Sequence, residues 1–150
     1  MRRIHPALVA LATLLVATTL TAETASSRVE VSAYVIGRTT GGVVGEPQAL
    51  VLSAEDVARG WVEVSEPIAL QIRSNQRAGF KLLASVGGPV TQVELHGLGD
   101  EWVIGGSGGW ISMPYRGTSV QQYAVSCRLK LDENAAPGTY AWPVQIALAN

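Results

Sequence analysis

One glycine-rich segment has the spacing of a nucleophilic serine. Gly105-Gly-Ser-Gly-Gly109 fits the hydrolase pattern G-x-S-x-G, in which a strained turn between a strand and a helix exposes the serine. The residues after Gly109 have the composition of a strand, and glycines around one serine are also typical of a hairpin loop. A triad of Ser107, His96 and an acid such as Asp100 stays an alternative, that of a small secreted hydrolase. We predict no catalytic residues and no enzymatic activity.

A second group of chemically capable side chains surrounds His96. Glu94 and His96 are two residues apart, so in a strand they project from the same face. A metal ion would need three or four converging ligands, and Asp100 and Glu101 follow a flexible Gly-Leu-Gly turn. We interpret the group as a solvated polar face, and we expect no metal ion and no cofactor.

Aromatic side chains flank the glycine-rich loop, and the three that could bind a ligand are Trp102, Trp110 and Tyr115. Exposed rings on a β-face can stack on sugar rings, which would make the chain a carbohydrate- or ligand-binding module. Aromatic side chains also supply much of the buried area of a sandwich core, so core packing is the competing interpretation.

Cys127 is the single cysteine of the chain, which excludes an internal disulfide framework. It falls in phase with the apolar residues Val125 and Leu129. We therefore expect a buried, unreactive thiol, and an intermolecular disulfide or a reactive thiol is the alternative.

Two alternating stretches near the carboxyl end indicate how such side chains are positioned. Large apolar residues alternate with mostly polar ones from Ser119 to Leu131, and large apolar residues occupy every second position again from Tyr140 to Leu148. Alternation with a period of two predicts two half-buried β-strands, each with one apolar face. The Pro137-Gly-Thr-Tyr140 junction between them resembles the corner of an immunoglobulin-like sandwich.

The rest of the chain predicts short strands separated by turn residues. The expected strands are 28–36, 49–52, 61–64, 68–74, 80–86, 90–95, 102–104 and 110–113. We expect a loop over 37–45, one helical turn between Ser53 and Gly60, and a hairpin of strands 68–74 and 80–86. Since no helical segment is long enough for a parallel crossover, the sequence predicts an all-β, immunoglobulin-like antiparallel two-sheet sandwich with one short helical turn.

The amino terminus predicts export. Arg2 and Arg3 precede an apolar run over 7–20 and small residues around Ala22, which together indicate a signal peptide over 1–22. The apolar run is shorter than the roughly 20 residues that a spanning helix needs, so we expect no membrane span after cleavage. Residues 23–150 would form a single domain, secreted to the periplasm or cell surface. No basic patch stands out, and we expect no nucleic-acid partner.

Both ends of this expected domain resemble a known family. Val29-Glu-Val-Ser-Ala-Tyr-Val35 is similar to the V-x-V-S-A-x-V opening of archaic chaperone–usher pilins and spore coat protein U-like proteins. Ala136-Pro-Gly-Thr-Tyr140, followed by an alternating strand, resembles the end of the same subunits. The resemblance implies an incomplete sandwich whose missing strand comes from a neighbour. Such subunits commonly carry a cysteine pair that begins soon after the opening, where this chain has Gly37-Arg-Thr39.

We therefore expect a non-enzymatic structural or interaction protein of the bacterial envelope or surface, and the resemblance implies a pilin-like assembly subunit. The resemblance implies that Val29, Val31, Ala33 and Val35 are the strand-donor residues. The expected partner is protein, either other envelope subunits or further copies of the chain. The alternative is a ligand-binding module that uses the three aromatic residues.

Overall fold

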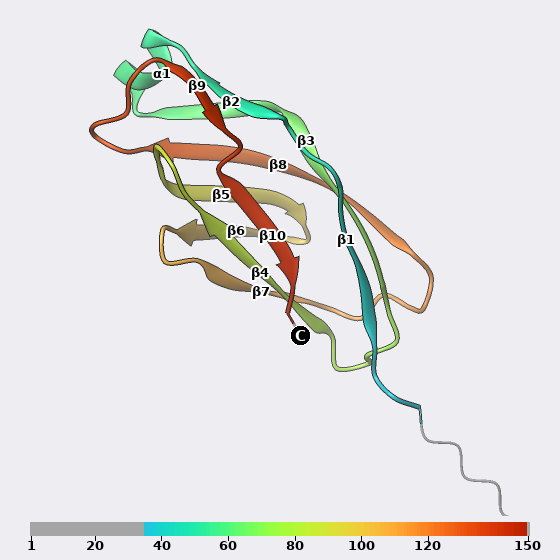
Figure 1. The fold of residues 1–150 in the computed structure, drawn as a ribbon. Helices are drawn as coiled ribbons and strands as arrows, with labels where there is room; N and C mark the ends of the chain where they lie inside the picture. The colour runs from blue at the N-terminus through green and yellow to red at the C-terminus, as the bar shows by residue number, and fades with distance from the viewer. Residues whose placement is uncertain (1–34, 150) are drawn as a thin grey trace, which may run out of the picture. The chain divides into compact units, whose positions relative to one another are not determined.

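A computed structural model describes residues 35–149 of the chain, which fold into strands and one short helix (Figure 1). In chain order the elements are β1 (Thr39–Gly45), β2 (Ala49–Leu52), α1 (Ala54–Arg59), β3 (Trp61–Ser74), β4 (Phe80–Val86), β5 (Val90–Leu98), β6 (Asp100–Gly105), β7 (Gly109–Met113), β8 (Gln121–Leu131), β9 (Gly138–Ala141) and β10 (Val144–Leu148). The predicted signal peptide lies outside the described residues.

The strands form antiparallel sheets throughout. One sheet has five strands in the order β1-β3-β8-β5-β6, the second has three in the order β10-β4-β7, and β2 pairs with β9. Figure 1 shows β4 and β10 running across β5 and β6 of the larger sheet. The predicted all-β antiparallel sandwich with one short helix is confirmed, and its immunoglobulin-like topology stays a prediction.

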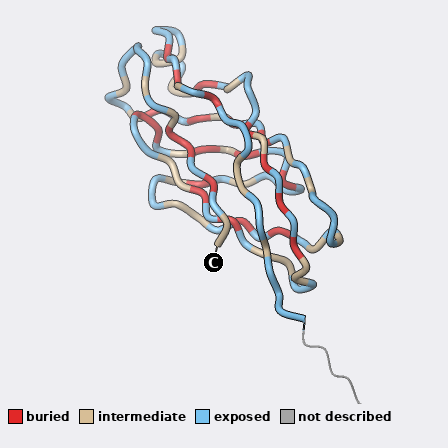
Figure 2. Tube along the Cα trace, turned by 45° about the vertical axis from the view of Figure 1, so that its right-hand side comes forward, coloured by how far each residue is buried: buried red, intermediate tan, exposed pale blue. Residues whose placement is uncertain are grey.

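The core lies between the sheets and is built from every second residue of the strands. Along β8 the inward residues Val125, Cys127, Leu129 and Leu131 are buried, while Lys130 is exposed. Figure 2 shows the same change between buried and exposed segments along the strands of both sheets. Alternation predicted this arrangement because successive side chains of a strand project to opposite faces.

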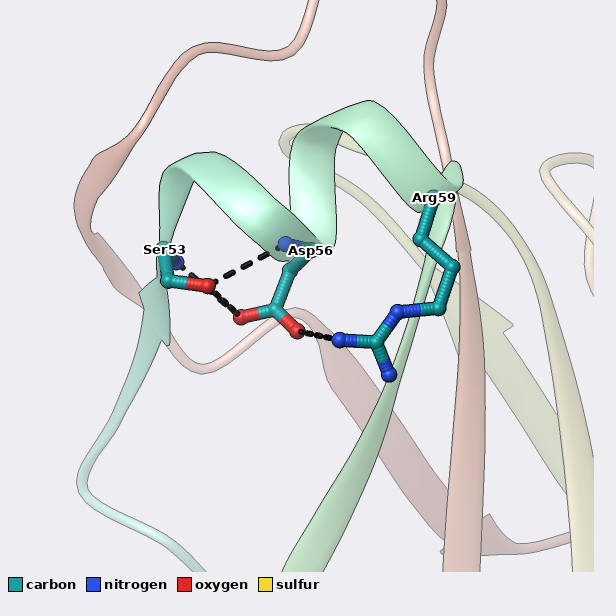
Figure 3. Close-up of polar contacts among 3 residues, drawn as sticks. All are labelled: Ser53, Asp56 and Arg59. Atoms are coloured by element: carbon teal, nitrogen blue, oxygen red, sulfur yellow. Dashed lines mark hydrogen bonds and ion pairs between the residues drawn. The ribbon is translucent and has the colours of Figure 1, made fainter.

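Helix α1 is short and its first turn is fixed by a capping box (Figure 3). The Ser53 hydroxyl accepts a hydrogen bond from the Asp56 amide at 3.1 Å, and the Asp56 carboxylate accepts one from the Ser53 amide at 3.0 Å. The Ser53 hydroxyl also donates a hydrogen bond to the Asp56 carboxylate at 2.6 Å. This bond, the bond from the Ser53 amide and the Arg59 guanidinium 3.1 Å away lower the pKa of Asp56. Gly60 ends the helix in the left-handed conformation with φ 79°, which glycine adopts without strain.

Two predicted boundaries in the first half were wrong. Residues 39–45 form the edge strand β1 rather than a loop, and Gly41 allows it to approach β3, since a Cβ there would overlap the Gln71 carbonyl. The predicted strands 61–64 and 68–74 are one strand, β3, whose register shifts between Val64 and Ile68. Pro67 lies in that interval, and it has no amide hydrogen for a ladder bond.

Two predicted connections were also wrong. Strands β3 and β4 do not form a hairpin, because β3 pairs within the five-stranded sheet and β4 within the three-stranded sheet. The predicted strand 140–148 is divided at Trp142-Pro143 into β9 and β10, which belong to different sheets. Pro143 has no amide hydrogen, so a continuous ladder is interrupted there.

Candidate functional site

Among the described strands, β10 has a paired neighbour on one side only. Its residues pair with β4, with Ile146 opposite Ala84 and Leu148 opposite Leu82. On its other side, no strand within residues 35–149 pairs with it, although β1 lies close by and pairs only with β3 (Figure 1). The outer edge of β10 therefore presents backbone groups without a strand partner in the described part of the chain.

The inward side chains of β10 become less covered towards its end. Val144 is 1% exposed, Ile146 is 9% exposed, and Leu148 is only half-buried. The edge strand β7 differs, since its inward residues Ile111 and Met113 are 0% and 2% exposed. The core is therefore closed beside β7 and incompletely closed beside β10.

The edges also differ in the features that discourage pairing with another chain. Strand β6 has Asp100 and Glu101, and β1 has a register shift between Val43 and Gly45. Charged side chains and bulges are the usual means of protecting an edge. Strand β10 reads Val-Gln-Ile-Ala-Leu and has neither a charge nor a bulge.

The predicted donor residues lie mostly outside the described part of the chain. This holds for Val29, Val31 and Ala33. Val35 is described, and it is 76% exposed, as is its neighbour Ile36 at 73%. Both belong to no strand, although the sequence predicted strand structure through residue 36. Two apolar side chains thus lie in solvent immediately before β1.

The three candidate ligand-binding aromatics have different environments. Trp102 packs against the core from β6, Tyr115 is half-buried in the loop after β7, and Trp110 is 57% exposed. Trp110 lies opposite Leu83 of β4, which in turn lies opposite Ala147 of β10. Leu83 is 40% exposed, and its alternation with the buried Leu82 and Ala84 places it on the outer face.

Cys127 of β8 lies in the hydrophobic core, as its position in the alternating pattern predicted. The residue is 4% exposed, and burial raises the pKa of its thiol to about 12. A protonated, buried thiol is a poor nucleophile, so the position supports packing rather than chemistry.

The serine and histidine of the alternative triad lie at opposite ends of the β5–β6 hairpin. Ser107 is in the turn after Gly105, which is opposite Gln92. His96 lies four residues further along β5, roughly 13 Å away at the usual rise of a strand. A strand, β7, follows Ser107, so the helix that completes a nucleophile elbow is not formed there.

The polar residues around His96 come closer together than the sequence suggested. Glu94, His96 and Glu101 each offer a potential ligand atom, and these atoms lie within 4.8 Å of one another. Strands β5 and β6 continue to Leu98 and from Asp100, so the Gly97–Gly99 turn is a tight connection rather than a flexible loop. The antiparallel register, which local sequence does not reveal, places Glu101 beside His96.

Comparisons with protein-family models, with curated proteins and with solved structures find no match to this chain. Within residues 35–149, no helix is both long and apolar enough to cross a membrane.

Proposed function

We propose that the chain is an exported, non-enzymatic assembly subunit of the bacterial envelope or surface, in which the segment 29–35 of another copy pairs with the open edge of β10. The observation that carries the proposal is the exposure gradient along β10, from Val144 at 1% to the half-buried Leu148, beside an edge that pairs with no strand among residues 35–149. An immunoglobulin-like sandwich that lacks one strand would have this property.

The chemistry of the two segments is complementary. An added strand supplies backbone hydrogen bonds to the edge, and every second side chain reaches the core. Val29, Val31, Ala33 and Val35 have that spacing, and so do the inward residues of β10. The donor side chains are small and apolar, and they would cover Ile146 and Leu148 without introducing a charge.

The decisive experiment disables the donor segment 29–35 and the acceptor edge of β10 in separate variants. In protein that begins at residue 23, Val31→Asp removes an apolar donor residue, and Leu148→Asp places a charge in the acceptor edge. The matched controls are Ser32→Asp and Ala147→Asp, which carry the same charge at neighbouring positions of opposite phase. Each protein is unfolded, refolded and measured by light scattering.

We expect the unmodified protein and both controls to form chains of subunits after refolding. Val31→Asp and Leu148→Asp should each be monomeric, because each lacks one half of the contact. An equimolar mixture should give a dimer and no longer species, since one partner has only the acceptor and the other only the donor. An unmodified protein that stays monomeric would contradict strand donation, and so would a mixture that does not dimerise.

A second candidate is binding of a carbohydrate or similar ligand, which the exposure of Trp110 favours. Its ring lies in a row with Leu83 and Ala147 across the outer face of the three-stranded sheet. Such a flat apolar row suits the face of a sugar ring, and Trp102 would not take part because it packs against the core.

A glycan array tests this candidate. Trp110→Ala should abolish binding, whereas Trp110→Tyr should retain part of it because an aromatic face remains. Trp102→Phe is the control for a general effect of tryptophan loss. Unchanged glycan binding by Trp110→Ala would rule out this row as the ligand site.

A further inference from the structure

We propose that Glu94, His96 and Glu101 form a binding site for one divalent transition-metal ion, for which Zn²⁺ is the probe. The site lies on the outer face of the five-stranded sheet, on β5 and β6. The site is separate from the β10 edge, so the metal-binding proposal does not depend on the proposed assembly function.

Strand geometry brings the three ligands together. Glu94 and His96 are alternate residues of β5, and their inward neighbours Val93 and Leu95 are both 0% exposed. Leu95 lies opposite Trp102, so Glu101 is the outward residue of β6 nearest to His96. Two rigid strands thus present one imidazole and two carboxylates to a common point.

The distances require only side-chain adjustment. The candidate ligand atoms lie within 4.8 Å of one another. In a tetrahedral zinc site with bonds of 2.0–2.2 Å, neighbouring ligand atoms are roughly 3.4 Å apart. Glutamate and histidine side chains close a difference of this size by small rotations, with the backbone unchanged.

The ligand atoms are available and the surface around them is concave. None of the side-chain hydrogen bonds or ion pairs found within residues 35–149 involves His96 or Glu101. The three residues border a surface hollow of about 300 Å³, whose lining also includes Glu63, Ser126 and Cys127. An ion bound there would keep at least one coordination position open to solvent.

Arg128 is the single competing cation at this hollow. Its guanidinium lies 3.7 Å from the Glu94 carboxylate and 4.1 Å from the centre of the Trp61 ring. The β-sheet register also places Arg128 opposite Glu63 on β3. If the Glu94 carboxylate binds a metal ion instead of Arg128, the guanidinium can keep its contact with the Trp61 ring. It can also pair with the carboxylate of Glu63, which lies opposite Arg128 in the sheet.

The ligand types select the class of metal. Imidazole suits Zn²⁺, Cu²⁺ and Ni²⁺, whereas Ca²⁺ and Mg²⁺ prefer oxygen ligands alone. One histidine and two carboxylates, with a remaining position for water, match the donor set of an open zinc site.

The test is a zinc titration of untagged, metal-free protein against a chromogenic zinc indicator. We expect one ion per chain. His96→Gln and Glu101→Gln should each weaken binding at least about tenfold, since each removes a direct ligand. Glu133→Gln, an exposed carboxylate in the loop after β8, is the matched control and should leave the affinity unchanged.

Two further variants identify the ligands independently. Arg128→Gln should bind zinc about two- to fivefold more tightly, because the cation that competes for Glu94 is gone. Cys127→Ala should bind as well as the parent protein, since the thiol is buried and faces the core. In NMR spectra, zinc should shift the ring signals of His96.

The proposal is overturned by any of three results: no stoichiometric zinc binding, binding that survives His96→Gln, or binding that is lost in Cys127→Ala. All the ligand substitutions are at exposed or half-exposed positions. Unchanged circular dichroism of the variants therefore separates loss of ligands from loss of fold.

Discussion

Strands β8 and β10 have the same sequence pattern but different surroundings. Both have a large apolar residue at every second position, and both turn these side chains to the core. Strand β8 lies between β3 and β5, while β10 has β4 on one side only among the described strands. As a result Leu129 is 0% exposed in the middle of the five-stranded sheet, and Leu148 is half-buried at the edge of the three-stranded sheet.

The two strands therefore have different roles: β8 stabilises the subunit, and β10 is available for pairing with another molecule. A strand that is paired on both sides contributes to the core and has no backbone groups left for another molecule. An edge strand with partly covered apolar residues contributes less to the isolated subunit and retains the capacity to pair. Equivalent substitutions in the two strands should therefore have unequal effects, and equal effects would contradict this comparison.

The largest effect is expected in β8. Leu129→Ala should lower the free energy of unfolding by about 2–5 kcal/mol, because a fully buried leucine leaves a cavity. Lys130→Ala, at the next and exposed position, should change it by less than about 0.5 kcal/mol. Urea unfolding of monomeric protein measures both, and equal effects would contradict the assignment of the core face.

Thiol chemistry gives the next contrast. Cys127 on β8 should react with a thiol reagent at pH 8 at least about a hundredfold more slowly than a cysteine introduced by Ala147→Cys on the outer face of β10. Denaturant should remove the difference. The introduced cysteine is measured in protein that also carries Cys127→Ala, so that it is the single thiol. Rapid labelling of Cys127 in the native protein would show that the core face of β8 is accessible to solvent.

The raised pKa of the Cys127 thiol makes the free energy of unfolding depend on pH. Burial raises its pKa from 9.0 to about 12, so the folded state holds the proton more tightly than the unfolded state. This contribution to stability is complete below pH 9.0 and is lost as the pH rises through about 12. Cys127→Ala should show a smaller loss of stability between pH 9 and pH 11 than the parent protein.

The smallest effect is expected at the open edge. In the Val31→Asp monomer, Leu148→Ala should lower the free energy of unfolding by only about 1 kcal/mol, because the side chain is already half in solvent. In the unmodified protein, the same substitution should weaken assembly, measured as a fall in the light-scattering mass at equal concentration. A large effect on the monomer would show that Leu148 belongs to a closed core.

Sequence patterns predicted the features that depend on neighbouring residues. Alternation identified the core face of β8 and the burial of Cys127, and Ser53 with Gly60 marked the ends of the helix. These follow from strand periodicity and helix capping, which act over a few residues.

Features that depend on pairing between distant segments were not predictable in this way. The Gly- and Thr-rich segment 39–45 has weak strand propensity, and it forms β1 because β3 provides a ladder beside it. The assignment of β3 and β4 to different sheets, and the meeting of Glu101 with His96, likewise depend on the register of the whole sandwich. Neither is encoded in a local motif.

Hydrogen exchange along β8 and β10 tests the central claim most directly. In the Val31→Asp monomer, the amides of 144–148 should exchange on the order of a hundredfold faster than those of 125–131. In the assembled unmodified protein, protection of 144–148 should rise towards that of β8. Equal, high protection of both strands in the Val31→Asp monomer would show that β10 has no open edge and would contradict the account.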